Sequence, residues 1–284
     1  MSCRSELKLG SLFDGSGTAP MAAAMNGIKP VWASEIEKFP IAVTKARFPN
    51  MLHLGDITQI NGADIEPVDI IVGGSPCQDL SVAGRQKGLM DGGRSHLFFE
   101  MTRVIKEMRT ATNNRYPRYV LWENVPNALR ITDGKDFYEV IKQFADIAES
   151  GVSIPEPEKG KNGKLAWRNA GEIVGNGWSI AWRVLDSQYF GVAQRRRRVF
   201  LVLDLVDECA GQILFESEGV CWTPEKSREI WRTASCGIGD CAEIRCFYEG
   251  GHFGTWLDGK PTLRHSGGNC GGGSECIVIE KRVL

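Results

Sequence analysis

The sequence predicts an α/β fold whose core is a parallel sheet. Short apolar runs alternate with amphipathic stretches of helical length over about the first 200 residues. Two of these runs, residues 68–72 and 119–122, are continuously apolar, as in strands that are buried on both faces. From about residue 206 the alternation gives way to glycine-rich sequence. We therefore expect a larger domain over residues 1–206 and a smaller, irregular region over residues 207–284.

Each expected element follows from its local pattern. The apolar run at residues 7–13 is typical of a strand, and a glycine turn separates it from a helix of small residues that ends before Gly27. Residues 151–172 are polar and rich in Gly, Pro and Lys, which is typical of a surface insertion. The other expected strands are 30–34, 68–72, 119–122, 178–185 and 199–205, and the expected helices are 19–26, 39–47, 97–108 and 136–149.

The composition of the chain excludes several classes of protein. Of its 284 residues, 42% are hydrophobic and 24% are charged, which excludes a largely disordered chain. The formal net charge of −1 excludes a protein that coats nucleic acid by bulk positive charge, so DNA contacts must come from local basic patches. No apolar run is long enough to span a membrane and no secretory signal is recognisable, so we expect a cytoplasmic protein.

The cysteines favour a reducing compartment and no metal site. Their number, nine, is odd, so a complete disulfide framework is not expected. Cys236, Cys241 and Cys246 recur at a constant spacing that is wider than the Cys pairs of zinc ribbons and fingers. Reduced, partly buried thiols are the simpler interpretation.

Three glycine-rich or acidic segments follow successive expected strands, where an open parallel sheet binds its ligands. The first is the turn at residues 13–17, whose glycines let a ligand approach the backbone closely. Glu35 follows the second strand and suits a ribose diol, while Asp56 follows the next segment and suits an adenine amino group. Taken singly, each acid is better explained as a solvated loop residue or a helix cap. As an ordered set, they predict an adenosine pocket with a glycine floor.

Cys77 follows Pro76 in a turn at the end of the apolar run 68–72. A cysteine beside the start of a helix can have a lowered pKa and act as a nucleophile, although a lone cysteine is more often a buried structural thiol. The next residues, 78–95, are rich in glycine and basic side chains. This composition suits a loop that closes over an anionic polymer, and it also suits a merely mobile surface loop.

Two further strand ends carry charged side chains. Glu123 ends the second continuously apolar run, where its carboxyl group could protonate or hydrogen-bond a heterocycle. The run QRRRR precedes the last expected strand, and in extended chain Gln194, Arg196 and Arg198 share one face. That face could serve a site while the other contacts phosphates, although a charge run is more often a solvated face.

This ordered set of segments resembles the C5-cytosine-specific DNA methyltransferases. The segments that carry the resemblance are FDGSG, SEIEK, GDIT, GGSPCQDLS, ENV and QRRRRVFLV. The insertion at residues 151–172 and the phrase WRVLDSQYFGVAQRRRRVF resemble members carried by bacteriophages and prophages. The resemblance covers about residues 8–205 closely and the remaining residues more loosely.

The resemblance implies a Rossmann-like, S-adenosylmethionine-dependent methyltransferase sheet with a small, irregular and incomplete target-recognition region. It implies methyl transfer from S-adenosyl-L-methionine to C5 of a cytosine flipped out of double-stranded DNA, in restriction-modification or anti-restriction. Cys77 is then the nucleophile that attacks C6. Glu123 holds N3 and the 4-amino group, and Arg198, together with Arg196, contacts O2.

The resemblance also implies the binding residues. Those for the cofactor are Phe13, Asp14, Gly15, Gly17, Glu35, Ile36, Asp56, Ile57 and Pro76. Those for DNA are Gln78, Ser81, Arg85, Gln194, Thr262, Leu263 and Arg264.

Two departures from the family pattern leave the activity of this chain alone open. Family members usually continue to a Gly-Asn-Ser/Ala motif on a late helix that completes the cofactor pocket, whereas Gly268-Asn269 is followed here by Cys270 and glycines. The target-recognition region is also short. We therefore carry three hypotheses: an active DNA (cytosine-5-)-methyltransferase, a truncated or split methyltransferase that needs a second chain for turnover, and an unrelated nucleotide-binding oxidoreductase with a redox-active Cys77. The third lacks a full dinucleotide fingerprint.

Overall fold

The computed structural model forms two compact units. It describes residues 6–76, 96–159, 163, 165–190 and 194–215, together with the backbone of two strands at 245–249 and 276–280. The first unit comprises Met1–Val184 and Arg198–Ser217, and the second comprises Leu185–Arg197 and Glu218–Leu284.

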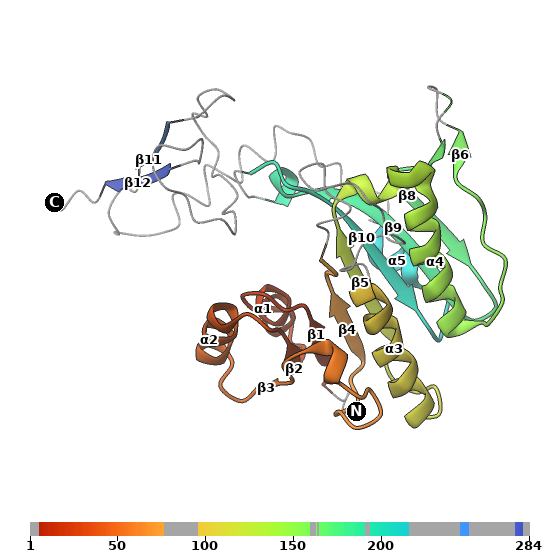
Figure 1. Ribbon diagram of the computed structural model, residues 1–284, viewed down its shortest axis with the longest axis horizontal. Helices are drawn as coiled ribbons and strands as arrows, with labels where there is room; N and C mark the ends of the chain where they lie inside the picture. The colour runs from red at the N-terminus through yellow and green to blue at the C-terminus, as the bar shows by residue number, and fades with distance from the viewer. Residues whose placement is uncertain are drawn as a thin grey trace, which may run out of the picture. The chain divides into compact units, whose positions relative to one another are not determined.

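An eight-stranded mixed sheet in the order β3-β2-β1-β4-β5-β10-β9-β8 organises the described chain (Figure 1). Neighbouring strands from β3 to β5 pair in parallel, whereas β5 and β10 are antiparallel, as are β8 and β9. The strands are β1 (Lys8–Leu12), β2 (Lys29–Ser34), β3 (Leu52–His53), β4 (Ile70–Gly73), β5 (Tyr119–Asn124), β8 (Ala170–Val174), β9 (Ser179–Asp186) and β10 (Arg197–Asp204).

The expected parallel sheet holds from β3 to β5 but not beyond, because β10 pairs antiparallel with β5 and β8 pairs antiparallel with β9. Parallel neighbours need a crossover of about a dozen residues or more. Only residues 187–196 separate β9 from β10, so the chain reverses between them. On its other side β10 pairs antiparallel with β5, and Phe200 lies opposite Glu123.

Helices cover both faces of the sheet (Figure 1). Because side chains alternate along a strand, Val120 and Trp122 face a core that includes residues of α3 and α4, whereas Leu121 packs with clusters that include residues of α1 and α5. Burial on both faces explains the continuous apolar runs in the sequence. The helices are α1 (Thr18–Met25), α2 (Lys38–Arg47), α3 (His96–Ala111), α4 (Lys135–Ala148) and α5 (Ala210–Leu214).

Residues 151–172 are not a plain surface insertion, and this expectation is corrected. Trp167 is buried, and its Nε1–H donates to the carbonyl oxygen of Gly134 over 2.9 Å. Ile154 is also buried, and β8 joins the edge of the main sheet. The two-residue strands β6 (Glu158–Lys159) and β7 (Leu165–Ala166) form a separate antiparallel pair. The few apolar residues here are too widely spaced to form a recognisable period.

One contact between β1 and β2 depends on the absence of a side chain. A Cβ added to Gly10 would overlap the ring of Trp32, which is fully buried on the neighbouring strand. The Trp32 indole N–H donates to the carbonyl oxygen of Glu66 over 2.9 Å, so the ring is held in that position. Gly10 is therefore required by close packing and not by its backbone angles.

The second unit contains an antiparallel pair, β11 (Arg245–Glu249) and β12 (Cys276–Glu280). The expected DNA-binding residues Thr262, Leu263 and Arg264 lie between these strands, outside the described residues. Among the helices that the structure describes, none has the length and apolar character that crossing a membrane requires.

Candidate active site

The glycine turn after β1 adopts a left-handed backbone at three positions. Phe13, Gly15 and Gly17 have φ angles of 56°, 58° and 79°. Gly17 is also the N-cap of α1, and a Cβ added to it would lie 3.1 Å from Thr44 Cγ2 and Oγ1. Both its angle and the available space therefore favour glycine at this position.

Asp14 supports this turn from within the protein. Its side chain accepts hydrogen bonds from Ser11 Oγ (2.6 Å) and from Thr44 Oγ1 (3.3 Å), and the residue is 6% exposed. Burial raises the pKa of Asp14, while the two hydroxyl hydrogen bonds and nearby His53 oppose that rise. The Asp14 carboxyl group therefore ties β1 to α2.

Glu35 is fixed by three backbone amides. Its Oε2 accepts from Gly15 N (2.8 Å), and its Oε1 accepts from Ile36 N (2.8 Å) and Glu37 N (3.0 Å). These bonds join the end of β2 to the glycine turn after β1 and give the carboxylate one orientation. Ile36 is next in the chain and is 66% exposed, so it offers an apolar surface beside that carboxylate.

Asp56 lies in the segment after β3, close in the fold to the end of β2. Ser34 Oγ donates to the carbonyl oxygen of Gly55 over 2.7 Å. The exposed Asp56 accepts from Thr58 N over 2.9 Å and so caps a 3-10 helix, η1 (Ile57–Gln59). Asp56 is therefore a helix cap, one of the two explanations that the sequence allowed. The lone pairs that do not accept from Thr58 N can still accept a hydrogen bond from a ligand. Ile57, the expected cofactor contact, is buried in the core.

An arginine on α3 fixes the same segment. Arg103 donates from Nη2 to the Ile57 carbonyl oxygen (3.0 Å) and from Nη1 to that of Ile60 (2.7 Å). Glu100 and Glu107 pair with the guanidinium at 2.6 Å and 2.9 Å. Sequence reasoning missed this residue, because an arginine between two glutamates on a helix resembles an ordinary solvated charge pattern.

The ends of β4, β5 and β10 bring a second set of residues together. Arg198 Nε and Glu123 Oε1 form an ion pair at 2.9 Å, with side chains 23% and 31% exposed. A Cβ added to Gly74 would lie 3.2 Å from Glu123 Oε2, so the carboxylate lies against the backbone that leads to residue 77. The structure therefore brings together Glu123 and Arg198, which the resemblance assigns to neighbouring parts of the same base.

A buried hydrogen bond links β5 to the segment after β4. The Trp122 indole N–H donates to Ser75 Oγ over 3.1 Å, and both residues are buried. Pro76 is exposed, and it is the last described residue before position 96. The expected nucleophile and loop contacts therefore lie outside the described residues: Cys77, Gln78, Ser81 and Arg85.

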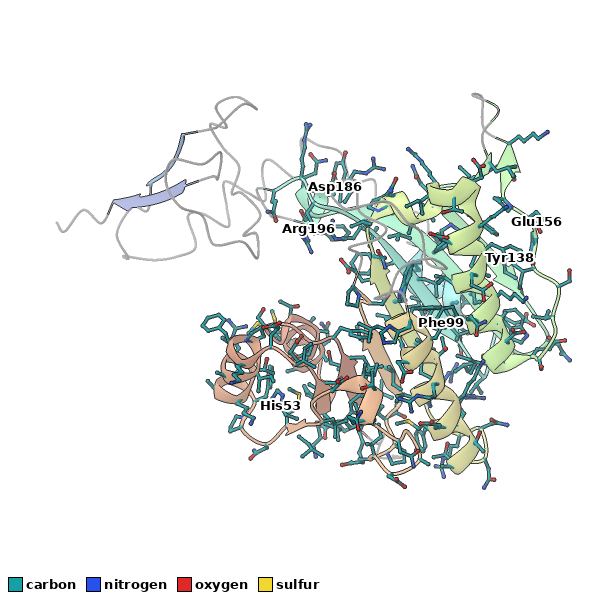
Figure 2. The ribbon with its side chains drawn as sticks, viewed as in Figure 1. His53, Phe99, Tyr138, Glu156, Asp186 and Arg196 are labelled. Carbon is teal, nitrogen blue, oxygen red and sulfur yellow. The ribbon has the colours of Figure 1, made fainter. Side chains whose placement is uncertain are left out.

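Gln194 and Arg196 belong to the second unit, at the connection between β9 and β10. Ser187 organises the backbone there, since its Oγ donates to the Gln194 carbonyl oxygen and accepts from Arg196 N at 3.2 Å. Ser187 N also donates to the Arg196 carbonyl oxygen over 3.1 Å. Figure 2 shows Arg196 and Asp186 at this connection.

The structure also identifies supporting residues that the sequence did not. Thr44 is a single polar residue in an otherwise ordinary helix, and no motif distinguishes it. Ser75 and Ser187 lie in segments that carry the family resemblance, but nothing in those segments indicated a supporting role for either side chain. Within the ranges that the structure describes, no group of three His, Cys, Asp or Glu side chains has the arrangement of a metal site.

Comparison with known proteins decides the family. The model for C-5 cytosine-specific DNA methylases matches residues 7–148 and 161–219. The chain belongs to this family.

Similar proteins include several methyltransferases. The chain is 38% identical over 257 residues to a "DNA N-6-adenine-methyltransferase" of Escherichia phage P1, covering 84% of this chain and 34% of that relative. It is 42% identical over 120 residues to the "Type II methyltransferase M1.ScrFI" of Lactococcus lactis subsp. cremoris, covering 42% of this chain and 28% of the relative. The chain therefore spans about a third of the length of these relatives.

A solved structure supports the fold. A crystal structure described as that of a DNA modification methyltransferase encoded within a prophage (E. coli) matches with a TM-score of 0.52 and 18% identity. The match covers 90% of this chain and 62% of that chain. The expectation of an α/β methyltransferase sheet is confirmed.

Proposed function

We propose that this protein transfers a methyl group from S-adenosyl-L-methionine to C5 of a cytosine in double-stranded DNA. The observation that carries the proposal is the arrangement of strand ends. The ends of β1 and β2 hold a glycine turn and an oriented Glu35, and the ends of β5 and β10 hold the Glu123–Arg198 pair. We assign cofactor binding and catalysis to residues 1–206, and target recognition to residues 207–284.

The residues at the first group of strand ends fit the cofactor. A carboxylate offers about four lone-pair sites, so Glu35, which accepts three amide hydrogen bonds, retains one on Oε2 for a ribose hydroxyl. The exposed Ile36 suits the face of an adenine, and Asp56 suits its amino group. Phe13, Gly15 and Gly17 would lie along the methionine moiety. When bound, S-adenosyl-L-methionine supplies an electrophilic methyl group.

The residues at the second group of strand ends fit the base. We infer that the Cys77 thiolate attacks C6 of a flipped cytosine, forming a C–S bond and making C5 nucleophilic. Glu123 holds N3 and the 4-amino group, and Arg198 neutralises charge that develops on O2. C5 would then take the methyl group from the sulfonium, with S-adenosylhomocysteine as the leaving group, and would lose its proton to a base. Elimination of the Cys77 thiolate restores the aromatic ring.

The Glu123–Arg198 pair supports these roles. An arginine 2.9 Å away stabilises the carboxylate before the base arrives, and its remaining donors can reach a second acceptor. Arg196 has a supporting role, and Gln78, Ser81, Arg85, Gln194, Thr262, Leu263 and Arg264 are the proposed DNA contacts. Type II and phage relatives favour a role in restriction-modification or its evasion.

Two alternatives give different results in one assay. The phage P1 relative is named for adenine N6, whose exocyclic amine can attack the methyl group directly and needs no thiolate. A truncated or split enzyme would bind cofactor or DNA without turnover until a second chain is added, and no comparison supports such a chain.

The test is transfer of labelled methyl groups to mixed unmethylated duplex DNA, followed by nucleoside analysis. We expect 5-methylcytosine, and we expect Cys77→Ser to lower the rate at least about 10³-fold while sparing cofactor binding. Cys209→Ser is the control and should retain activity, because this thiol follows the end of β10 that lies opposite Arg198. N6-methyladenine, or 5-methylcytosine formed at the normal rate by Cys77→Ser, would exclude the proposal.

A further inference from the structure

One buried threonine on α2 contacts three residues of the glycine turn. Thr44 is fully buried, and its Oγ1 lies 3.3 Å from Asp14 Oδ2 and 3.4 Å from the Gly15 carbonyl oxygen. The Cβ that a residue at position 17 would carry lies 3.1 Å from both Oγ1 and Cγ2. The turn between β1 and α1 therefore packs directly on a side chain from a different helix.

The threonine hydroxyl has one proton and three oxygens within reach. The nearest is the Pro40 carbonyl oxygen at 3.0 Å, the ordinary partner of a helical threonine four residues earlier. The contacts to Asp14 and Gly15 compete with it for the same proton. Ser11 supplies a second donor to the Asp14 carboxyl group at 2.6 Å. The turn is thus joined to β1 by one hydroxyl and to α2 by another.

The same helix also reaches Glu35. The N-cap of α2 is Glu37, whose backbone N–H donates to Glu35 Oε1, and Glu35 Oε2 accepts from Gly15 N. Glu35, the turn and Thr44 therefore form a closed ring of contacts. A change in the position of the turn relative to α2 would alter the orientation of the Glu35 carboxylate.

We propose that Thr44 is a positioning residue that holds the glycine turn, and through Gly15 the Glu35 carboxylate, in the cofactor-binding arrangement. Thr44 acts through these groups and does not itself touch the cofactor. This proposal rests on the proposed function for the identity of the cofactor, although the tie between α2 and the turn exists without a ligand.

The first measurement is amide hydrogen exchange over residues 13–18 in the full chain without cofactor. Thr44→Val removes the hydroxyl and keeps the shape, so exchange at Gly15 and Gly17 should rise about tenfold. Thr44→Ser restores the hydroxyl and should stay within about threefold of the parent. Thr110→Val is the matched control, because Thr110 is exposed and makes the same backbone bond, to the Lys106 carbonyl oxygen at 2.8 Å.

The second measurement is calorimetric binding of S-adenosylhomocysteine, with methyl transfer at saturating cofactor. We expect Kd to rise about tenfold in Thr44→Val and kcat to remain unchanged, since a positioning residue for the cofactor affects binding before chemistry. The proposal is overturned if Thr44→Val leaves amide exchange at Gly15 and Gly17 unchanged, or if exchange also rises throughout β4 and β5. It is equally overturned if Thr44→Ser has the same effect as Thr44→Val, or if Thr44→Val leaves the Kd for S-adenosylhomocysteine unchanged. A parent chain that binds no cofactor would contradict the proposed function, while exchange would still decide whether Thr44 holds the turn.

Discussion

The two groups of strand ends hold their carboxylates in different ways. At the ends of β1 and β2, Glu35 is bound by three backbone amides, and the Asp14 side chain is bound by two hydroxyls. At the ends of β5 and β10, Glu123 is paired with the long, partly exposed side chain of Arg198. Backbone amides cannot leave without moving the main chain of these turns, whereas a guanidinium can turn away by rotation about its side-chain bonds.

This difference in how the carboxylates are held matches the roles proposed for the two regions, cofactor binding and catalysis. A site that receives the same ligand in the same orientation at every turnover benefits from fixed donors. A site that must exchange a protein partner for a base benefits from a partner that can move. We therefore expect substitutions at the first group of strand ends to affect cofactor affinity, and substitutions at the second group to affect the chemical step.

Of the residues in these two regions, Glu123 is expected to show the largest effect. Glu123→Gln removes the carboxyl group that can share a proton with N3 of the base and that pairs with Arg198, so the single-turnover rate of methylation should fall about 10²- to 10³-fold. The Kd for S-adenosylhomocysteine should remain within about twofold, because Glu123 is not among the cofactor contacts. An unchanged single-turnover rate at neutral pH would remove Glu123 from the mechanism and erase the contrast between the two regions.

The next effect is expected at Glu35. Both of its carboxylate oxygens accept amide hydrogen bonds, so the NH₂ group of Glu35→Gln must face a donor in either orientation. The Kd for S-adenosylhomocysteine should rise about 10- to 100-fold, with kcat retained at saturating cofactor. Glu37→Gln, at an exposed neighbour whose side chain does not cap α2, is the control. A fall in kcat without a change in Kd would reverse our assignment.

A third effect concerns the buried hydrogen bond between Trp122 and Ser75, which supports the second region. Ser75→Ala leaves the buried indole N–H of Trp122 without this acceptor, which should lower the free energy of unfolding by about 1–3 kcal/mol. Equilibrium unfolding in urea measures the loss. If the hydrogen bond is the cause, Ser75→Ala should cost much less in a Trp122→Phe background. Equal costs in the two backgrounds would assign the loss to packing.

The smallest effect is the pH dependence of the free energy of unfolding, which we attribute to His53 next to the first region. Both ring nitrogens of His53 are buried without a hydrogen-bond partner among the described residues, and burial lowers the pKa of His53, with the charge of Lys45 acting in the same direction. The unfolded chain then binds the proton more readily, so stability should fall as the pH drops below about 6.5. Unfolding in urea at pH 7.5 and 5.5 should show a smaller fall for His53→Phe. An identical fall in both proteins would contradict this account.

The sequence predicted the central strands and helices well and their supporting contacts poorly. Runs such as residues 68–72 report burial directly, because a strand covered on both faces must be apolar throughout. Glu35 and Glu123 were singled out as candidates because each lies at the carboxyl end of a strand, where ligands bind in open sheets. The reversal of β10 is a pairing choice that periodicity does not encode. Contacts such as Trp122 to Ser75 join residues far apart in the chain, and one sequence contains no signal for them.

The close approach of Trp32 to Gly10 has a consequence for how this protein can change over generations. Any side chain at position 10 would occupy the space of the indole, and a smaller residue at position 32 would leave a cavity beside the glycine. Either substitution alone is harmful, while a matched pair can restore the packing. We therefore expect substitutions at positions 10 and 32 to be coupled. In a library in which both positions are randomised, folded variants that have changed position 10 should also have changed position 32.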